Sequence, residues 1–495
     1  MFILYIFILL LVMALVSFIA KKKAYAIATV ESIIILILTI LYAFVRFYGY
    51  TGGMVSKFSY PIDTSIGFSF SVGITPISMV LLFLTVAIMS MAIFVSGRES
   101  YDRRFYGLMM TTEAGLFGLL ISRNFLFFYV FWEAVIIPVF MLIAIFGGEK
   151  KESASLKFFV YTQIGSVFLL LSILTLFSFY SNSYHHGFTL NMGKLLSPAF
   201  ISGYITPGQP FWTDFILFGF FIAFLVKMPS FPLHSWLPDA YTAAPYPVTI
   251  VLSGAISLMG GYGFYAVIFP IASLVGSTVA WIIIGLGIIS LIYFAMVAMF
   301  QENMKKMMAY ASAASMGFIS ISLGVGILST GYNTYTSISG GIFQILAHGL
   351  IMGLVFSSLY IIKLNTGSES NLTVRGLFRE MPVVSAFFLG GLMASLGLPG
   401  LAGFISEASI VLASYETLGL LIFLVIFGMI ITASYHVWAA QKALNGPYNE
   451  FLGKVKDGSR GEIAALSLLF ILILLLGIYP SLFYHMIFVY IKGGI

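Results

Sequence analysis

The most informative part of the sequence is Lys227-Met-Pro-Ser-Phe-Pro-Leu-His-Ser-Trp-Leu-Pro-Asp239, which follows a long apolar run. About fourteen residues of that run precede Lys227, so its ammonium group is expected deep inside a membrane helix. A charge at that depth costs several kcal/mol and persists beside a partner or in a water-filled cavity. Because Pro229 and Pro232 break the helix just after it, a lysine that snorkels to the interface is the weaker alternative. The stretch therefore predicts a broken membrane helix on an ion path.

The composition assigns the whole chain, 1–495, to a single membrane domain. Hydrophobic residues make up 60% and charged residues 8%, too few charges to cover a water-soluble fold. Segments such as 1–20 and 468–477 are apolar on nearly every face, which favours helices over the alternating strands of a β-barrel. The expected fold class is an all-α integral membrane protein. The absence of cysteine excludes disulfides, thiolate metal sites and iron–sulfur ligation.

Apolar windows predict about fourteen transmembrane helices of about 20 residues each. They are expected to start near residues 1, 25, 73, 105, 125, 158, 213, 246, 274, 307, 337, 383, 418 and 463. With the spans numbered in order, loops after odd-numbered spans hold 18 of the 24 lysines and arginines. By the positive-inside rule those loops face the cytoplasm, so both termini are expected outside. Short basic loops, unlike one basic patch, argue against a nucleic-acid partner. The 18 residues are Lys21, Lys22, Lys23, Arg98, Arg103, Arg104, Lys150, Lys151, Lys157, Lys305, Lys306, Lys363, Arg375, Arg379, Lys442, Lys454, Lys456 and Arg460.

A second interruption, Gly397-Leu-Pro-Gly-Leu-Ala-Gly403, lies five spans after the first and is followed by Glu407. Two discontinuous helices in corresponding positions, each beside an ionisable residue, indicate an inverted-repeat transporter core. Spans four to eight and nine to thirteen are the expected five-helix repeats, with helices 7 and 12 broken. The corresponding residues are 1–100 for the N-terminal spans, 105–270 for the first repeat, 274–445 for the second repeat and 460–490 for the last span.

Other ionisable residues fall inside predicted spans. Glu113 lies in the fourth span, Glu133 in the fifth and His348 in the eleventh, all away from a predicted interface. Intramembrane ionisable residues mark ion pathways, although a lone histidine is more often a hydrogen bond between helices. His348 therefore gains weight only from the other ionisable groups inside the predicted spans. Glu31 and Glu416 lie close to span ends and are expected to be solvated.

Three more histidines carry less weight. His185 and His186 are neighbours in a predicted outer loop without further ligands, so a solvated pair is favoured over a metal site. His436, near the end of span thirteen, is a weaker relay candidate than His348.

Several motifs together resemble one family of membrane subunits. They are Phe131-Trp-Glu133-Ala-Val-Ile-Ile-Pro138, the 227–239 stretch, Met259-Gly-Gly-Tyr-Gly263, Met308-Ala-Tyr310, Ala347-His-Gly349 and Gly403-Phe-Ile-Ser-Glu407. Over about 65–480 the chain resembles the M-type (NuoM-type) antiporter-like subunits of respiratory complex I. The wider family includes subunits of Mrp antiporters and membrane-bound hydrogenases, and the proline-rich 227–239 stretch is specific to it.

The resemblance implies roles for four residues. The twelfth-span position is a lysine in N-type, L-type and Mrp subunits but a glutamate in M-type subunits, so Glu407 favours the M type. By the same resemblance, Glu133 is the glutamate at the subunit boundary and Lys227 is its lysine partner. His348 is the relay histidine, and Glu407 is the exit carboxylate.

The chain departs from the family pattern at two positions. The family's eighth-span lysine is Leu258 here, and its tenth-span histidine is Ser315. The central relay has thus lost two titratable groups, and nearby hydroxyls are expected to hold water instead, including those of Ser253 and Tyr262. The predicted supporting residues of the proton path are Glu113, His234, Asp239, Ser257, Ser312, Ser315 and Tyr310.

The expected function is that of a proton-translocating membrane subunit in a redox-driven pump of the NADH:quinone oxidoreductase type, with no redox chemistry on this chain. Iron–sulfur clusters and quinone are expected on partner subunits. The expected partners are N-type and L-type antiporter-like neighbours, small membrane subunits and the lipid bilayer of a prokaryotic plasma membrane. Alternatives are a subunit of a Mrp-type cation/proton antiporter or membrane-bound hydrogenase, a stand-alone secondary transporter, and a structural subunit that anchors its neighbours.

Overall fold

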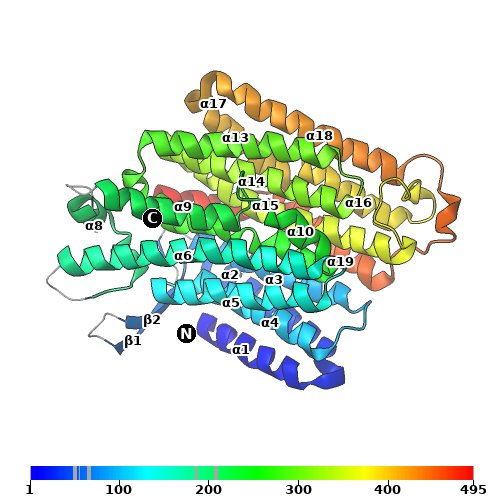
Figure 1. The fold of residues 1–495 in the computed structure, drawn as a ribbon, viewed down its shortest axis with the longest axis horizontal. Helices are drawn as coiled ribbons and strands as arrows, with labels where there is room; N and C mark the ends of the chain where they lie inside the picture. Colours follow the sequence, from blue (N-terminus) through cyan, green and yellow to red (C-terminus); the bar gives the residue numbers. More distant parts are fainter. Residues whose placement is uncertain are drawn as a thin grey trace.

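The computed structural model describes residues 2–47, 53–54, 56–63, 68–183, 188–205 and 210–493. His185 and His186 lie outside the described residues. Long helices lie side by side, with α1 (Phe2–Ile19) at one edge and α17 (Ala402–Leu418) and α18 (Ile422–Leu444) at the opposite edge (Figure 1). The predicted class, an all-α membrane protein, is confirmed.

The first half of the chain follows the predicted spans closely. Its long helices are α1, α2 (Ala24–Phe47), α3 (Pro76–Ser96), α4 (Arg103–Ile121), α5 (Phe125–Phe146) and α6 (Lys151–Ser183). After them come α9 (Pro210–Lys227) and α10 (Trp236–Ala243), followed by a helical stretch made of α11 (Tyr246–Val251), η3 (Leu252–Ile256), α12 (Met259–Gly263), η4 (Phe264–Ile268) and η5 (Phe269–Leu274).

The second half repeats this pattern of long helices with one break. Its helices are α13 (Ser277–Met299), α14 (Met304–Leu328), α15 (Tyr332–Thr366), α16 (Pro382–Ser395), α17, α18, α19 (Arg460–Ile478) and α20 (Ser481–Lys492). Short helical turns elsewhere are η1 (Lys21–Lys23), α7 (Met192–Leu195), α8 (Pro198–Phe200), η2 (Ile201–Ile205), η6 (Leu377–Arg379), η7 (Gly419–Leu421) and η8 (Glu450–Leu452).

Both predicted helix breaks are confirmed. The first break separates α9 from α10, and the indole Nε1 of Trp236 donates a hydrogen bond to the Val226 carbonyl at 2.9 Å, which satisfies one carbonyl freed by the break. The second break separates α16 from α17, where Gly397 and Gly400 have φ of 78° and 91°. Glycine adopts this left-handed conformation without a steric penalty.

The structure supports the fold class more fully than it supports the predicted number of spans and their grouping into repeats. Within the described chain, 11 helical segments are long and apolar enough to cross a membrane. The exact count of fourteen and the division into repeats at 105–270 and 274–445 stay predictions.

Two elements were not predicted from the sequence. An antiparallel hairpin of β1 (Ser56–Asp63) and β2 (Phe68–Ile74) joins α2 to α3, with an irregularity between Pro61 and Asp63. The amphipathic helix α20 follows α19, and its Tyr484 hydroxyl donates to the Thr336 carbonyl at 3.4 Å. Both elements are too short to give the long apolar signal of a membrane span.

The core is centred on α15, in which every residue of the most apolar 18-residue segment is buried. In the corresponding segments of α3 and α14, 89% of the residues are buried. By contrast, the corresponding windows of α1, α2 and α6 are only 33% buried and expose large apolar side chains such as Val45. Apolar side chains on the outside are expected where lipid surrounds the protein. The central helices α14 and α15 carry Ser312, Ser315 and His348, so these groups lie inside the bundle.

Candidate functional site

Lys227 is the last residue of α9 and lies directly at the first helix break. Its side chain is buried, with 1% of the residue exposed, and its Nζ has no hydrogen-bond partner among the described residues. The nearest aromatic rings are those of Trp132 and Phe158, with centroids 5.6 and 5.8 Å from Nζ. Ring faces attract a cation but cannot replace hydrogen bonds. The ammonium is thus held in an apolar pocket with its hydrogen-bonding capacity unused.

Glu133 lies on α5, next to the Trp132 that contacts Lys227. It is half-buried, and its Oε1 has no hydrogen-bond partner in the described chain. The Glu133 carboxylate acts electrostatically on Lys227 from beyond hydrogen-bonding distance. The two residues therefore lie near each other without closing an ion pair.

A polar row lies on the central helices around His348. The Ser312 hydroxyl and the His348 Nε2 are 3.1 Å apart. A small cavity follows, lined by Ser315, Gln344, His348 and Glu407 together with apolar residues and Ser395 and Gly403. The row thus leads from α14 across α15 to the carboxylate on α17.

The second break shapes the place where Glu407 lies. A Cβ atom on Gly397 would lie 2.6 Å from Oε2 of Glu407, so only a glycine leaves room for the carboxylate there. Ser406 donates its hydroxyl to Oε1 of Gln344, which connects α17 to the buried amide on α15. The broken helix therefore brings the carboxylate into the cavity beside His348.

A second small cavity lies beside Leu258, the position at which the resemblance implies a lysine in related subunits. It is lined mainly by leucines, with Thr85 and Tyr262 as the polar contributors. Both cavities have about 10 Å³ of room, close to the minimum for one water molecule. Space for water thus lies next to Leu258 and Ser315, the two positions at which the sequence analysis expected water in place of a titratable group.

Tyr241 and Gln344 are site residues that the sequence analysis missed. Tyr241 lies on α10 and is fully buried, next to the hydroxyls of Ser257 and Ser312. Gln344 lies one helical turn before His348, so a buried amide on the same face of the span was the available signal. An isolated tyrosine in a helix gave no such signal.

Three predicted supporting residues lie away from this row. The Asp239 carboxylate pairs with Lys157 at 2.7 Å, and both side chains are partly exposed. His234 packs against Phe294, with ring centroids 4.6 Å apart. Tyr310 is only half-buried. The structure does not bring these three groups to His348 or Glu407.

Glu113 and Glu31 form a separate acidic pair. Each is at most 1% exposed, the two interact electrostatically, and neither carboxyl has a hydrogen-bond partner among the described residues. The expectation that Glu31 is solvated is wrong, because α2 turns this residue toward α4 rather than toward the aqueous phase.

Glu416 is exposed, as expected. His436 is buried, and its Nδ1 lies 2.8 Å from the Thr432 carbonyl oxygen.

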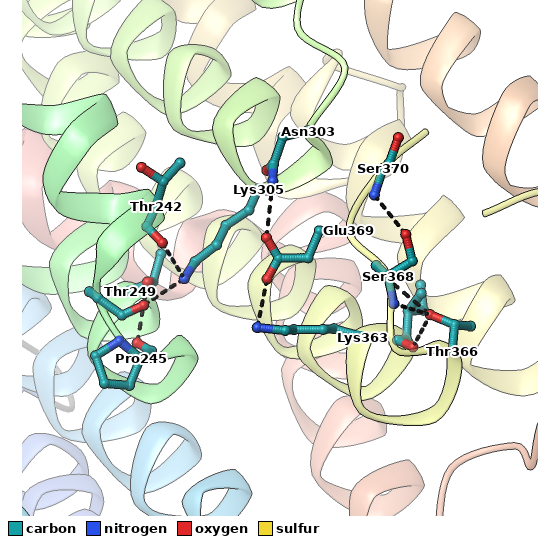
Figure 2. A network of polar contacts seen from close by, with 12 residues as sticks. Thr242, Pro245, Thr249, Asn303, Lys305, Lys363, Thr366, Ser368, Glu369 and Ser370 are labelled. Atoms are coloured by element: carbon teal, nitrogen blue, oxygen red, sulfur yellow. Dashed lines mark hydrogen bonds and ion pairs between the residues drawn. The ribbon is translucent and has the colours of Figure 1, made fainter. Parts of the chain in front are cut away.

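Lys305, expected in a basic loop, is instead buried in the first turn of α14 with 2% of the residue exposed. Its Nζ donates to the Ala244 and Thr242 carbonyls at 2.6 and 3.3 Å, at the carboxyl end of α10. Figure 2 shows this contact beside the Glu369 carboxylate. A cation there satisfies carbonyls that a helix end leaves unpaired and interacts favourably with the helix dipole.

Glu369 connects Lys305 to the loop after α15. Its carboxylate pairs with Lys363 at 3.0 Å and accepts a hydrogen bond from Asn303 at 3.1 Å. Burial disfavours its charge, but the Lys305 and Lys363 charges and the hydrogen bonds from Lys363 and Asn303 outweigh it, so the pKa of Glu369 lies below its ordinary value. This network is saturated, unlike the surroundings of Lys227.

Comparison with known proteins gives the family. Residues 122–432 match the model described as "NADH:quinone oxidoreductase/Mrp antiporter, TM". The chain belongs to this family. It is 34% identical to F(420)H(2) dehydrogenase subunit M of Methanosarcina mazei over 478 residues, which cover 95% of this chain and 93% of that protein. It is 35% identical to NADH-quinone oxidoreductase subunit M of Rickettsia felis over 420 residues, which cover 84% and 81%.

A solved structure has the same fold. A chain of respiratory complex I from Thermus thermophilus superposes with a TM-score of 0.87 at 26% identity, over 99% of this chain and 97% of that chain. Both sequence relatives are M subunits, so the assignment to M-type antiporter-like subunits is confirmed. The family is one of transmembrane subunits, and the chain is a multi-pass membrane protein.

Proposed function

We propose that this chain is the M-type proton-translocating membrane subunit of a redox-driven complex of the complex I type. Its strongest support is Lys227, a buried ammonium at a helix break for which the described residues supply no hydrogen-bond partner, because an intramembrane charge of this kind marks an ion path. In this proposal Glu133 controls the proton affinity of Lys227, and protons pass through buried water and His348 to Glu407.

The energetics of the switch are sufficient. A carboxylate that approaches an ammonium to about 4 Å stabilises the charged form by about 4 kcal/mol at an effective dielectric near 20. Moving one charge against about 100 mV costs about 2.3 kcal/mol. Because Glu133 is half-buried, a neighbouring subunit could move its side chain toward or away from Lys227. Closing and opening this pair would therefore bind and release a proton against the membrane potential.

The chain supplies the proton path, and electron transfer belongs to partner subunits that hold iron–sulfur clusters and quinone. The partners are the other membrane subunits of the complex, with N-type and L-type neighbours on either side. The proposed location is the plasma membrane of a prokaryote, with basic loops such as 97–104 and 445–460 in the cytoplasm and both termini outside.

The test is Lys227→Met in the assembled complex, in membrane vesicles that carry an acridine dye as the probe of ΔpH. Vesicles receive NADH in one arm and reduced F420 in the other, because the two M-subunit relatives carry these donors in their names. The proposal predicts loss of most proton uptake per electron transferred in the variant. Lys454→Met, at an exposed loop lysine, is the matched control and keeps wild-type coupling. Unchanged proton uptake in Lys227→Met would refute the proposal.

A Mrp-type antiporter subunit is the second candidate, because the family description includes Mrp antiporters. The same vesicles discriminate between the two. A sodium gradient imposed without an electron donor would acidify or alkalinise vesicles that contain an antiporter, whereas the redox-driven pump requires the donor.

A further inference from the structure

Tyr241 carries a polar group that the fold leaves unsatisfied. Its side chain is fully buried on α10, and its hydroxyl has no hydrogen-bond partner among the described residues. Buried polar groups are nearly always paired, so an unpaired hydroxyl needs a reason such as a water molecule or a functional role. Tyr241 therefore differs from Tyr265, an equally buried tyrosine whose hydroxyl bonds to the Ile319 carbonyl and the Ser322 hydroxyl at 3.2 and 3.1 Å.

The unsatisfied hydroxyl points toward the polar row. It lies close enough to the hydroxyls of Ser257 and Ser312 to feel both, but it meets the geometry of a hydrogen bond with neither. Ser312 in turn contacts His348 at 3.1 Å, and Ser257 donates to the Ser253 carbonyl at 3.2 Å. Ser257 directly precedes Leu258, which lines the apolar cavity. Tyr241 therefore lies between this cavity and His348.

The position of Tyr241 is fixed from several sides. Its carbonyl accepts a hydrogen bond from Thr249 at 2.9 Å, and its ring meets Phe356 edge to face at 6.0 Å. The chain just after Tyr241 is fixed as well, because Lys305 donates hydrogen bonds to the carbonyls of Thr242 and Ala244. Figure 2 shows the bond to Thr242. The missing hydrogen bond is thus no consequence of a loosely held side chain. The backbone is anchored while the hydroxyl is left free to bond.

On the basis of the proposed function, we propose that the Tyr241 hydroxyl is a proton-transfer group of the relay, between Ser257 on one side and Ser312 and His348 on the other. A hydroxyl both donates and accepts hydrogen bonds. Its oxygen takes a proton from water beside Ser257 as its own proton passes to water beside Ser312. One O–H bond forms as the other breaks, so the phenol carries no net charge afterwards. The relay thereby crosses the region in which Leu258 replaces a titratable residue.

The test is Tyr241→Phe in the assembled complex, which removes only the hydroxyl. We expect the initial rate of electron-driven proton uptake to fall about tenfold, the rate factor that corresponds to about one hydrogen bond lost from a barrier. Thermal stability of the solubilised complex should not fall, because the lost hydroxyl bonds to none of the residues that the structure describes. Tyr265→Phe is the matched control with the opposite pattern, since it removes a satisfied hydroxyl and should lower stability while proton uptake per electron stays unchanged.

Lys227→Met, measured in parallel, distinguishes a failure of the role of Tyr241 from a failure of the proposed function. Loss of coupling in Lys227→Met with full coupling in Tyr241→Phe would overturn the role of Tyr241 and leave the proposed function standing. Full coupling in both variants would overturn both. A loss of coupling in Tyr241→Phe that is matched by an equal loss in Tyr265→Phe would also contradict the relay role, because it would reduce the effect to general packing.

Discussion

Two buried lysines, Lys227 and Lys305, have opposite surroundings. Both are at most 2% exposed, and both lie near an aromatic ring, Trp132 at 5.6 Å for Lys227 and Tyr246 at 4.2 Å for Lys305. The Lys305 ammonium also donates to two backbone carbonyls, whereas the Lys227 ammonium has no hydrogen-bond partner in the described chain.

This difference in hydrogen bonding shows that burial of a lysine does not by itself indicate a function. Lys305 completes the carboxyl end of α10 and shares the field of Glu369, so its charge is part of the architecture. Lys227 has only ring faces and a distant carboxylate, so its charge is stabilised only when a partner or water arrives. Lys305 is thus held in place by fixed hydrogen bonds, whereas the part of the chain that the structure describes offers Lys227 none.

The largest expected effect comes from Lys305→Met. The variant leaves the Ala244 and Thr242 carbonyls without their donor and removes one of the two cations that act on the Glu369 carboxylate, which should cost about 3 kcal/mol of stability. Thermal unfolding of the solubilised complex measures it. Lys227→Met should leave stability equal or higher, because it removes a buried charge that makes no hydrogen bond within the described part of the chain. An equal destabilisation by both variants would break the comparison.

The same contrast can be sharpened at the second break, with Gly397→Ala. The new methyl group would meet Oε2 of Glu407 at 2.6 Å, and a left-handed φ of 78° costs alanine about 1–2 kcal/mol. Because the carboxylate must move, proton uptake per electron should fall as well.

Gly400→Ala is the matched control for the second break. Its φ is 91°, and no atom of the described residues lies within 4 Å of the added Cβ, so Gly400→Ala carries the backbone cost alone. Wild-type coupling in Gly400→Ala beside weak coupling in Gly397→Ala would support a functional place for Glu407. Equal coupling in the two variants would argue against it.

Glu369→Gln should cost about 1 kcal/mol near neutral pH, because it removes a carboxylate that two lysines and Asn303 stabilise. The pKa of Glu369 in the folded protein lies below the ordinary value of 4.5, so its stabilisation is present above that pH and is lost as pH falls through the folded-state pKa. Melting temperatures of wild type and variant should therefore converge as the solution is acidified below about pH 4.5. A gap that widens on acidification would contradict this sign.

The smallest effect is expected for Asp239→Asn. Its ion pair with Lys157 is 2.7 Å long but joins side chains that are 48% and 34% exposed, so the loss should be about 0.2–1 kcal/mol and should shrink in high salt. Coupling should stay at the wild-type level. Weakened coupling would place Asp239 in the proton path, as the sequence analysis predicted.

The sequence predicted the features that depend on local pattern. Apolar length located most of the long helices, and the proline and glycine runs after Lys227 and before Glu407 located both breaks. Resemblance added the weight given to Glu133 and His348, and the structure places His348 in one cavity with Glu407.

The remaining features depend on how each helix is rotated against its neighbours. Lys305 in the first turn of a span has the same local pattern as an interfacial lysine, and only the carboxyl end of α10 shows that it is buried. Glu31 likewise lies near a span end, yet its helix directs it toward Glu113. Tyr241 is distinguished by the hydrogen bond that it does not make, which no sequence pattern reveals.

The most direct measurement of the central claim is a cryo-electron microscopy map of the assembled complex at a resolution that shows ordered water. The account predicts water bonded to the Lys227 ammonium and the Tyr241 hydroxyl, and water in the cavities beside Leu258 and Ser315, so that a hydrated row reaches Glu407. A dry interior, with both cavities closed and no solvent at Lys227, would contradict it.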